Sequence, residues 1–197
     1  FIPVFVLFIV VPFGPNAIAS DLGLGLLFIL AIATLPVIGI LMAGWGSNNK
    51  YPMLGGVRAA AQAISYEVPM VLTLATVALW AGTLRTGEIV RAQQGNWFVF
   101  SPLALGFVLM VICSLAEVNR TPFDIPEAES ELVGGFHTEY SGIRFAMFYL
   151  AEFMNAVTFA AVITTLFLGG PNGPILFGPD WIWGIVWFFA KLFVLLF

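Results

Sequence analysis

Four ionisable side chains interrupt stretches of the sequence that are otherwise apolar: Glu67, Glu117, Glu152 and Lys191. On insertion scales, an ionisable group near the centre of a membrane helix costs about 2.5 to 3.5 kcal/mol, so each such residue is a functional candidate. Carboxyl groups that lie close together in a medium of low dielectric constant interact strongly and can pass protons between them. A row of such groups therefore predicts a path for protons.

The depths of these residues in the membrane are expected to be compatible. At about 1.5 Å per residue, Glu67 and Glu152 would both lie roughly 13 to 15 Å from the inner face, with Glu117 shallower. Lys191 would approach from the opposite side. The alternative is that each carboxylate only ties neighbouring helices together through hydrogen bonds to hydroxyl or amide groups.

The elements that hold these residues are predicted to be membrane helices. Hydrophobic residues make up 60% of the 197 and charged residues 9%, and the mean hydropathy is +1.01. This composition could not cover the surface of a water-soluble domain. In hydrocarbon every backbone N–H and C=O needs an internal partner, and long apolar runs favour helices over an alternating barrel. We predict one all-α integral membrane domain over 1–197, a multi-pass transmembrane bundle.

The bilayer core, about 30 Å thick, requires roughly 20 apolar residues per helix. Because the sequence begins at Phe1 without Met and stops inside an apolar run, we expect it to be the interior of a longer protein, truncated at both ends. About six helices are then visible, the first and last of them partial: 1–12, 21–43, 59–84, 98–118, 143–168 and 181–197.

The orientation follows from the basic residues of the connections. Strict alternation places the connections 44–58 and 118–142 on one side of the membrane. By the positive-inside rule that side is cytoplasmic, and a bacterial inner membrane is the expected location. The basic residues on that side are Lys50, Arg58, Arg120 and Arg144, and those on the opposite side are Arg85 and Arg91.

The connection from Glu117 to Tyr140 is long and acidic, with Arg120 as its one basic residue. Pro126 could open a short helix whose first turn is stabilised by acids through the helix dipole. Loops of this length in compact proteins are usually functional, so we expect a functional inner loop. Its acids are Glu117, Asp124, Glu127, Glu129, Glu131 and Glu139.

Several other classes of protein lack their motifs in this sequence. Cys113 is the single cysteine, which excludes an internal disulfide and an iron–sulfur cluster held by this chain alone. His137 has no Cys or His neighbours, so we expect a surface histidine at the membrane interface and no metal site. No P-loop, dinucleotide fingerprint or basic patch for nucleic acid occurs. Any redox cofactor is therefore expected on partner chains.

Several long motifs in a fixed order carry a family resemblance over nearly the whole chain. They are GWGSNNKY at 44–51, GGVRAAAQ at 55–62, SYE at 65–67, AEVNRTPFD at 116–124, PEAESELV at 126–133, HTEY at 137–140 and AEF at 151–153. In these motifs the chain resembles the quinone-site membrane subunit of respiratory complex I. The family includes the corresponding membrane subunits of the bacterial NADH:quinone oxidoreductase and of the mitochondrial enzyme.

The resemblance implies a subunit of eight helices, of which this chain would lack the first, part of the second, the end of the seventh and all of the eighth. Such a subunit joins the peripheral redox arm to the other membrane-arm subunits and forms much of the quinone tunnel in the lipid bilayer. Quinone is then the substrate, while NADH, FMN and the iron–sulfur clusters belong to partner subunits. This chain would hold no covalent cofactor and no catalytic redox residue.

Individual residues also match the family. Glu67, Glu117 and Glu152 match its buried carboxylates, which link the quinone cavity to the membrane arm. Thr34 departs from the pattern, because several respiratory relatives carry a further glutamate there. Glu152 favours the respiratory form over photosynthetic relatives. Five residues match the family's charged inner loop beside the quinone cavity: Arg120, Asp124, Glu127, Glu129 and Glu131. Arg58 matches a basic residue on the same face of the subunit.

The leading hypothesis is therefore a subunit of a proton-translocating NADH:quinone oxidoreductase, in which quinone chemistry near the inner loop is coupled to proton movement through buried carboxylates. One alternative is the homologous membrane subunit of an energy-converting hydrogenase, which needs no quinone. Another is a stand-alone secondary transporter, because broken helices and charges at the membrane midplane also occur there.

Overall fold

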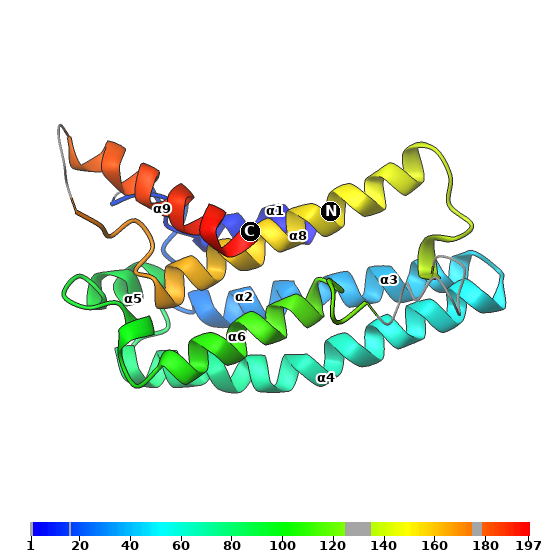
Figure 1. The fold of residues 1–197 in the computed structure, drawn as a ribbon, viewed down its shortest axis with the longest axis horizontal. Coiled ribbons are helices and arrows are strands. Elements are labelled where there is room, and N and C mark those ends of the chain that lie inside the picture. The colour runs from blue at the N-terminus through cyan, green and yellow to red at the C-terminus, as the bar shows by residue number, and fades with distance from the viewer. Residues whose placement is uncertain (1, 16, 125–134, 175–178) are drawn as a thin grey trace.

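The computed structural model describes residues 2–15, 17–124, 135–174 and 179–197, and no strand occurs among them. This confirms the predicted all-α class (Figure 1). The helices are α1 (Ile2–Leu7), α2 (Gly25–Ala33), α3 (Leu35–Gly46), α4 (Lys50–Ala81), α5 (Thr86–Ala92), α6 (Ala104–Glu117), α8 (Ile143–Phe167) and α9 (Asp180–Leu196). Short 3-10 turns are η1 (Phe8–Val10), η2 (Phe98–Phe100) and η3 (Gly135–His137).

Three stretches of helix are long and apolar enough to cross a membrane. They are Gly25–Gly46, which combines α2 and α3, then Lys50–Ala81 and Ile143–Phe167. The apolar helix α6 is shorter. Large apolar side chains are exposed on these helices, among them Leu79 and Ile143, whose side chains would contact lipid in a bilayer. These features are consistent with the predicted multi-pass membrane bundle.

The helices form an elongated bundle with two distinct ends (Figure 1). One end holds the turn between α3 and α4, the η3 turn and the start of α8, and we call it the inner end. The other holds α5, the end of α8 and the start of α9, and we call it the outer end. Of the two connections that the sequence places on one side of the membrane, 44–58 and the described residues 135–142 lie at the inner end, whereas residues 118–124 lie nearer the middle of the bundle (Figure 1).

The buried apolar core is concentrated toward the outer end. Residues of α2, α4, α5, α6 and α8 meet there in one cluster that includes Leu74, Ile89, Met110 and Phe167. Toward the inner end, the buried apolar cluster between α3 and α4 contains only Val37, Ala60 and Ala63. The larger buried apolar cluster therefore lies toward the outer end, and the cluster between α3 and α4 is smaller.

The expected connection over 44–58 is wrong in its extent, because α4 begins at Lys50 and not near residue 59. Asn49 caps this helix by accepting a hydrogen bond from the Tyr51 backbone N–H at 3.4 Å. Pro52 lies in the first turn, where its missing N–H costs no helical hydrogen bond. Gly56 continues the helix and approaches Gly44 of α3, where an added Cβ would lie 3.3 Å from the Gly44 Cα. Glycine here serves close helix packing.

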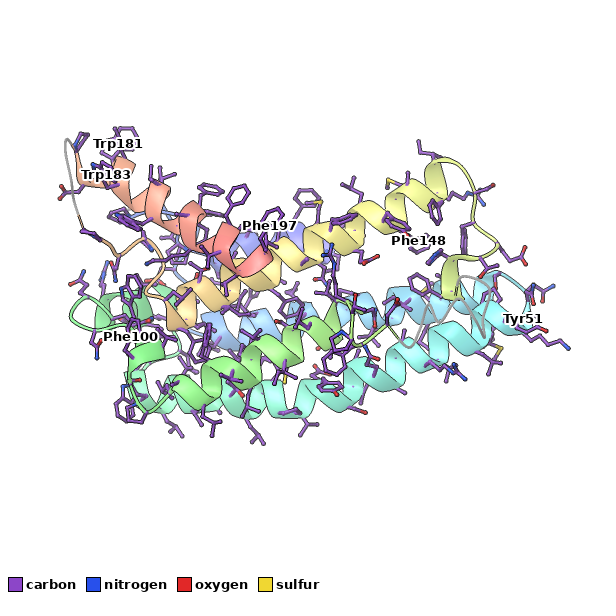
Figure 2. The ribbon with its side chains drawn as sticks, viewed as in Figure 1. Tyr51, Phe100, Phe148, Trp181, Trp183 and Phe197 are labelled. Carbon is purple, nitrogen blue, oxygen red and sulfur yellow. The ribbon has the colours of Figure 1, made fainter. Side chains whose placement is uncertain are left out.

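The segment between the predicted helices 59–84 and 98–118 also contains a short helix, α5, because Thr86 and Ile89 are fully buried against the core. The Thr86 hydroxyl donates to the Val10 carbonyl oxygen at 2.6 Å. Aromatic side chains mark both ends of the bundle, as an interfacial belt predicts: Trp181 and Trp183 lie at the outer end and Tyr51 at the inner end (Figure 2).

Candidate functional site

Glu67 lies near the middle of α4 and contacts the junction between α2 and α3. The Thr34 hydroxyl donates a hydrogen bond to Glu67 Oε1 at 2.7 Å. Thr34 Oγ1 also lies 2.9 Å from the Leu30 carbonyl oxygen, one helical turn earlier. The first candidate carboxylate is thus tied to a hydroxyl group on a neighbouring helix, in a half-buried position.

Glu117 is the last residue of α6 and lies close enough to Glu67 for their charges to repel each other. Its Oε2 atom is buried and has no hydrogen-bond partner among the described residues. An ionised oxygen without a donor is costly in a protein interior, whereas a carboxyl group that gains a proton or a water molecule is not. The position therefore suits a group that exchanges protons.

Glu117 and Glu152 line one cavity of about 250 Å³, which we call the inner cavity. Glu152 comes from α8, so the two carboxylates reach the cavity from different helices. Its walls are mostly apolar, with Asn119 and Asn155 as further polar residues. At about 30 Å³ per molecule, the cavity has room for several waters. The apolar lining comprises Pro3, Val4, Leu35, Pro36, Val37, Ile40, Ala63, Val118, Phe136, Phe148 and Ala151.

The start of the inner loop lies beside Glu152. Arg120 and Asp124 are both within electrostatic range of this carboxylate. The Arg120 guanidinium also lies over the ring of Phe153, 5.2 Å from its centroid. Both loop residues are exposed. The structure thus brings Glu117, Glu152, Arg120 and Asp124 together.

Arg58 lies on an exposed part of α4, in the segment that the sequence assigns to the inner face. The remaining inner-loop candidates, Glu127, Glu129 and Glu131, lie outside the described residues, as does the short helix expected after Pro126. Among the residues with described coordinates, no group of three or more His, Cys, Asp or Glu side chains is placed to hold a metal ion.

Gln62 is a structural part of the site that was not predicted as a site residue. Its amide nitrogen lies 2.8 Å from the carbonyl oxygens of Ala116 and Phe123 and 3.2 Å from the Asn119 side-chain oxygen. The side chain is 8% exposed. A buried amide inside an apolar helix is the signal that could have found it. Gln62 holds the end of α6 and the first inner-loop residues against α4.

His137 is buried in an aromatic cluster, so the expected surface histidine is wrong. Its ring contacts Phe136, Phe145 and Tyr149, with centroid separations of 5.1, 5.3 and 6.0 Å. Burial lowers the pKa of His137 below its ordinary value, and the nearby Asp124 carboxylate partly opposes this shift. The physical reason is that η3 folds back onto α4 at Gly55, which encloses the histidine.

Lys191 lies apart from the carboxylates, against the turn that follows α8. Its ammonium group donates to the carbonyl oxygens of Leu168, Gly170 and Asn172 at 2.6, 2.9 and 2.6 Å. It also lies 4.2 Å from the centroid of the Trp97 ring. An ammonium has three donors, and all three are used here.

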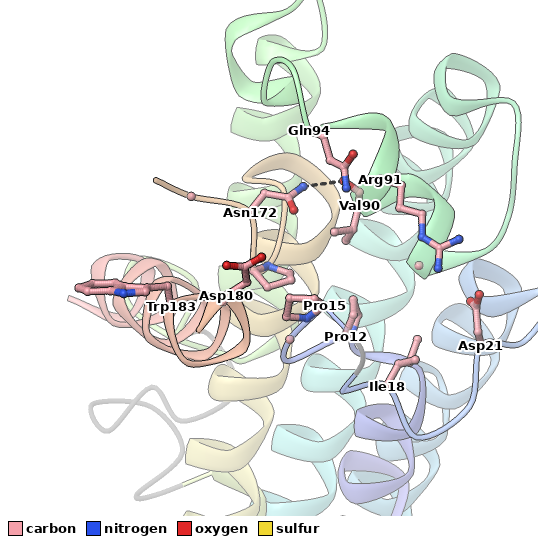
Figure 3. Close-up of a pocket in the computed structure, with 15 residues that line it drawn as sticks. Pro12, Pro15, Ile18, Asp21, Val90, Arg91, Gln94, Asn172, Asp180 and Trp183 are labelled. Carbon is pink, nitrogen blue, oxygen red and sulfur yellow. Dashed lines mark hydrogen bonds between the residues drawn. The ribbon is translucent and has the colours of Figure 1, made fainter. Parts of the chain in front are cut away.

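A second cavity, of about 420 Å³, lies at the outer end (Figure 3). Figure 3 shows Asn172 at its edge, where the side chain donates to the Val90 carbonyl oxygen at 2.7 Å. Its charged lining residues are Asp21, Arg91 and Asp180. None of the candidate carboxylates lines this cavity, so the inner cavity is the one connected with the predicted site.

Comparison with known proteins gives one family for the whole chain. The family model described as NADH dehydrogenase matches residues 1–197. A protein of Bacillus cytotoxicus, named as the H subunit of NADH-quinone oxidoreductase, is 49% identical over 197 residues, which cover 100% of this chain and 58% of the relative. Proteins of the same name from Frankia alni and Bacillus thuringiensis are 49% and 50% identical, covering 100% and 97% of this chain. The chain spans 46% and 56% of their lengths.

Proposed function

This chain belongs to the NADH dehydrogenase family, and from that premise we propose that it is part of a quinone-site membrane subunit of a proton-translocating NADH:quinone oxidoreductase. The chain is an integral membrane protein of helices. In the proposed assembly it binds peripheral-arm and membrane-arm subunits, and quinone is the substrate. NADH, FMN and the iron–sulfur clusters belong to the partner subunits.

The observation that carries the proposal is the inner cavity, which both Glu117 of α6 and Glu152 of α8 line. Waters in this cavity would connect the two carboxylates through hydrogen bonds. Glu67 extends the set toward α2 and α3, since its charge and that of Glu117 interact. We propose that protons move between these three carboxyl groups.

The inner loop supplies the proposed link to quinone. Arg120 and Asp124 lie beside Glu152, so a change of charge near the loop would be felt at that carboxylate. Electrostatic interactions are strong where water is largely excluded, which permits coupling without direct contact. We propose that Arg58, Arg120 and Asp124, together with Glu127, Glu129 and Glu131, form the edge of the quinone cavity. The loop then faces the cytoplasm of a bacterium.

Lys191 remains a proposed member of the proton path on the outer side. Its described contacts are backbone carbonyl oxygens, which accept hydrogen bonds but carry no exchangeable proton. A role in proton movement therefore requires the ammonium group to release a proton to a water molecule or to a partner subunit.

Two other functions remain as alternatives, and each makes a different prediction. The membrane subunit of an energy-converting hydrogenase would need no quinone, whereas the similar proteins carry names that include quinone oxidoreductase. Quinone-dependent activity in membranes separates these two. A stand-alone transporter would function as an isolated chain, so purification of a functional monomer would favour it.

The test of the proposed function is Glu152→Gln in the complete protein, assembled with its partner subunits. We expect NADH-driven quinone reduction and proton pumping to fall about tenfold or more, because general acid–base groups contribute on this scale and the amide cannot carry the proton. Reduction of an artificial acceptor by the peripheral arm should remain, which shows that the peripheral arm is intact. Normal pumping by the Glu152→Gln variant would overturn the role.

The matched control is Glu139→Gln. Glu139 is an exposed inner-end carboxylate whose Oε1 accepts a hydrogen bond from the Asn49 side chain at 2.6 Å. The amide oxygen of glutamine can accept the same bond. We expect this variant to pump protons normally.

A further inference from the structure

Thr34 lies at the interruption between α2 and α3, between Glu67 and a backbone acceptor. Its Oγ1 atom is 2.7 Å from Glu67 Oε1 and 2.9 Å from the Leu30 carbonyl oxygen. The residues Thr34 and Glu67 are 33 positions apart, so their contact joins two separate helices. Both side chains are half-buried.

The interruption between α2 and α3 is explained by Pro36 in the sequence. Pro36 lacks a backbone N–H and therefore cannot bond to the carbonyl group four residues before it. Helix α2 ends at Ala33, and Thr34 bonds back toward Leu30 with both its hydroxyl and its backbone N–H, the latter at 3.3 Å. Threonine commonly makes such back-bonds, which bend helices.

The hydroxyl has one proton and two acceptors within reach. It can donate to the Glu67 carboxylate or to the Leu30 carbonyl, but not strongly to both. When it donates to Leu30, its oxygen lone pairs face Glu67, and only a protonated carboxyl group can then complete the short contact. The two orientations of the hydroxyl therefore match the two protonation states of Glu67.

We propose that Thr34 is a positioning residue for Glu67, whose hydroxyl turns with the charge of this carboxyl group. While Glu67 is ionised, Thr34 donates to it. When Glu67 takes a proton, the carboxyl group donates to Thr34 Oγ1 and the hydroxyl donates to Leu30. Threonine keeps its own proton throughout, so no proton is gained or lost at this residue. Both states of Glu67 remain hydrogen-bonded.

The consequence is that Glu67 can change charge at little cost in solvation. A half-buried carboxyl group without such a partner would lose a hydrogen bond in one of its states. The inference rests on the proposed function, because it takes Glu67 to change protonation during turnover. The charges of Glu117 and Glu67 interact across the α4–α6 contact.

The test is Thr34→Val, made in the complete protein assembled with its partner subunits. Valine retains the branched shape and removes the hydroxyl. We expect coupled quinone reduction to fall about tenfold, the effect of losing a hydrogen bond to a charged group. Infrared difference spectra should show the C=O band of protonated Glu67 at higher frequency. Thr34→Ser, which retains the hydroxyl, should restore both the rate and the band.

The matched control is Thr73→Val in α4. The Thr73 hydroxyl makes the same kind of back-bond, to the Pro69 carbonyl oxygen at 2.8 Å. This variant should leave the rate and the Glu67 band unchanged. An equal loss in Thr34→Val and Thr73→Val would overturn the proposal, since the back-bond alone would explain it.

Glu67→Gln separates the inference from the proposed function. It identifies the Glu67 band and should itself abolish coupled turnover. If Glu67→Gln pumps normally, the proposed path fails; if only Thr34→Val behaves as wild type, the path stands and the role of Thr34 fails. Thr34→Ala provides a second variant without the hydroxyl, and failure of both Thr34 variants to assemble would also count against a positioning role.

Discussion

Gly55 of α4 lies against the backbone of Phe136, so closely that a Cβ atom at residue 55 would be 2.8 Å from the Phe136 nitrogen. The Gly135 carbonyl carbon would lie at 2.9 Å. Both obstacles are backbone atoms, which cannot turn away as a side chain can. The η3 turn, and with it the wall of the inner cavity at Phe136, thus depends on glycine at this position.

We expect Gly55→Ala to displace η3 and to destabilise the protein by about 1 to 3 kcal/mol, as overpacking does. The measurement is thermal inactivation of the assembled complex, together with protease sensitivity near η3. Gly39→Ala is the control, because an added Cβ at this α3 position meets no atom within 4 Å. Equal stability of the two variants would contradict the close approach.

Gln62→Leu should loosen the start of the inner loop. The substitution leaves the carbonyl oxygens of Ala116 and Phe123 without the donor that Gln62 provides, at a cost of about 1 to 3 kcal/mol. Hydrogen exchange should quicken at residues 116–124 and remain unchanged in α8. Ser65→Ala is the control, since the exposed Ser65 hydroxyl bonds only back to Ala61 in the described contacts. Unchanged hydrogen exchange in Gln62→Leu would show that the hydrogen bonds of Gln62 are not needed to hold the start of the inner loop.

Hydropathy was sufficient to predict the all-α class, because the length of an apolar run directly limits a membrane helix. Polarity inside those runs identified Glu67, Glu117 and Glu152. The start of α4 could not be predicted in the same way. A glycine pair locally favours a break, but close approach of Gly44 and Phe136 gives the pair a packing role inside the helix.

Contacts between helices could also not be predicted from the sequence. The bond between Thr34 and Glu67 depends on how α3 and α4 are rotated against each other, which periodicity alone does not fix. The role of Gln62 depends on backbone carbonyl groups, which every residue has and which give no sequence signal. Burial of His137 follows from the path of η3 across α4 and not from its neighbours in the chain.

His137 should make the inner end less stable in acid. Burial lowers its pKa in the folded protein, so below the unfolded value of about 6.5 the unfolded chain binds a proton that the folded chain does not. Stability is therefore fully present above about pH 6.5 and falls as the pH decreases through the lowered pKa. Thermal unfolding between about pH 5 and 8, the range in which histidine titrates, measures this loss.

His137→Phe is the variant that tests this pH dependence, because its ring remains apolar at every pH and can pack in the same aromatic cluster. The variant should show a flatter dependence of unfolding temperature on pH over the same range. An identical pH profile in the two proteins would assign the acid sensitivity to other groups.

Lys191 has two possible roles, which Lys191→Arg distinguishes. It either carries protons or acts as a clamp, a fixed donor that holds the turn after α8 through hydrogen bonds. The described contacts favour the clamp, because the ammonium group bonds three carbonyl oxygens that follow α8. A guanidinium can donate to several of these oxygens but does not release its proton. We expect Lys191→Arg to retain most proton pumping, whereas Lys191→Met should destabilise the outer end by about 2 to 3 kcal/mol through loss of charged hydrogen bonds. Pumping measured in vesicles and thermal inactivation together give the answer: a stable Lys191→Arg variant that no longer pumps would support the proton path predicted from the sequence.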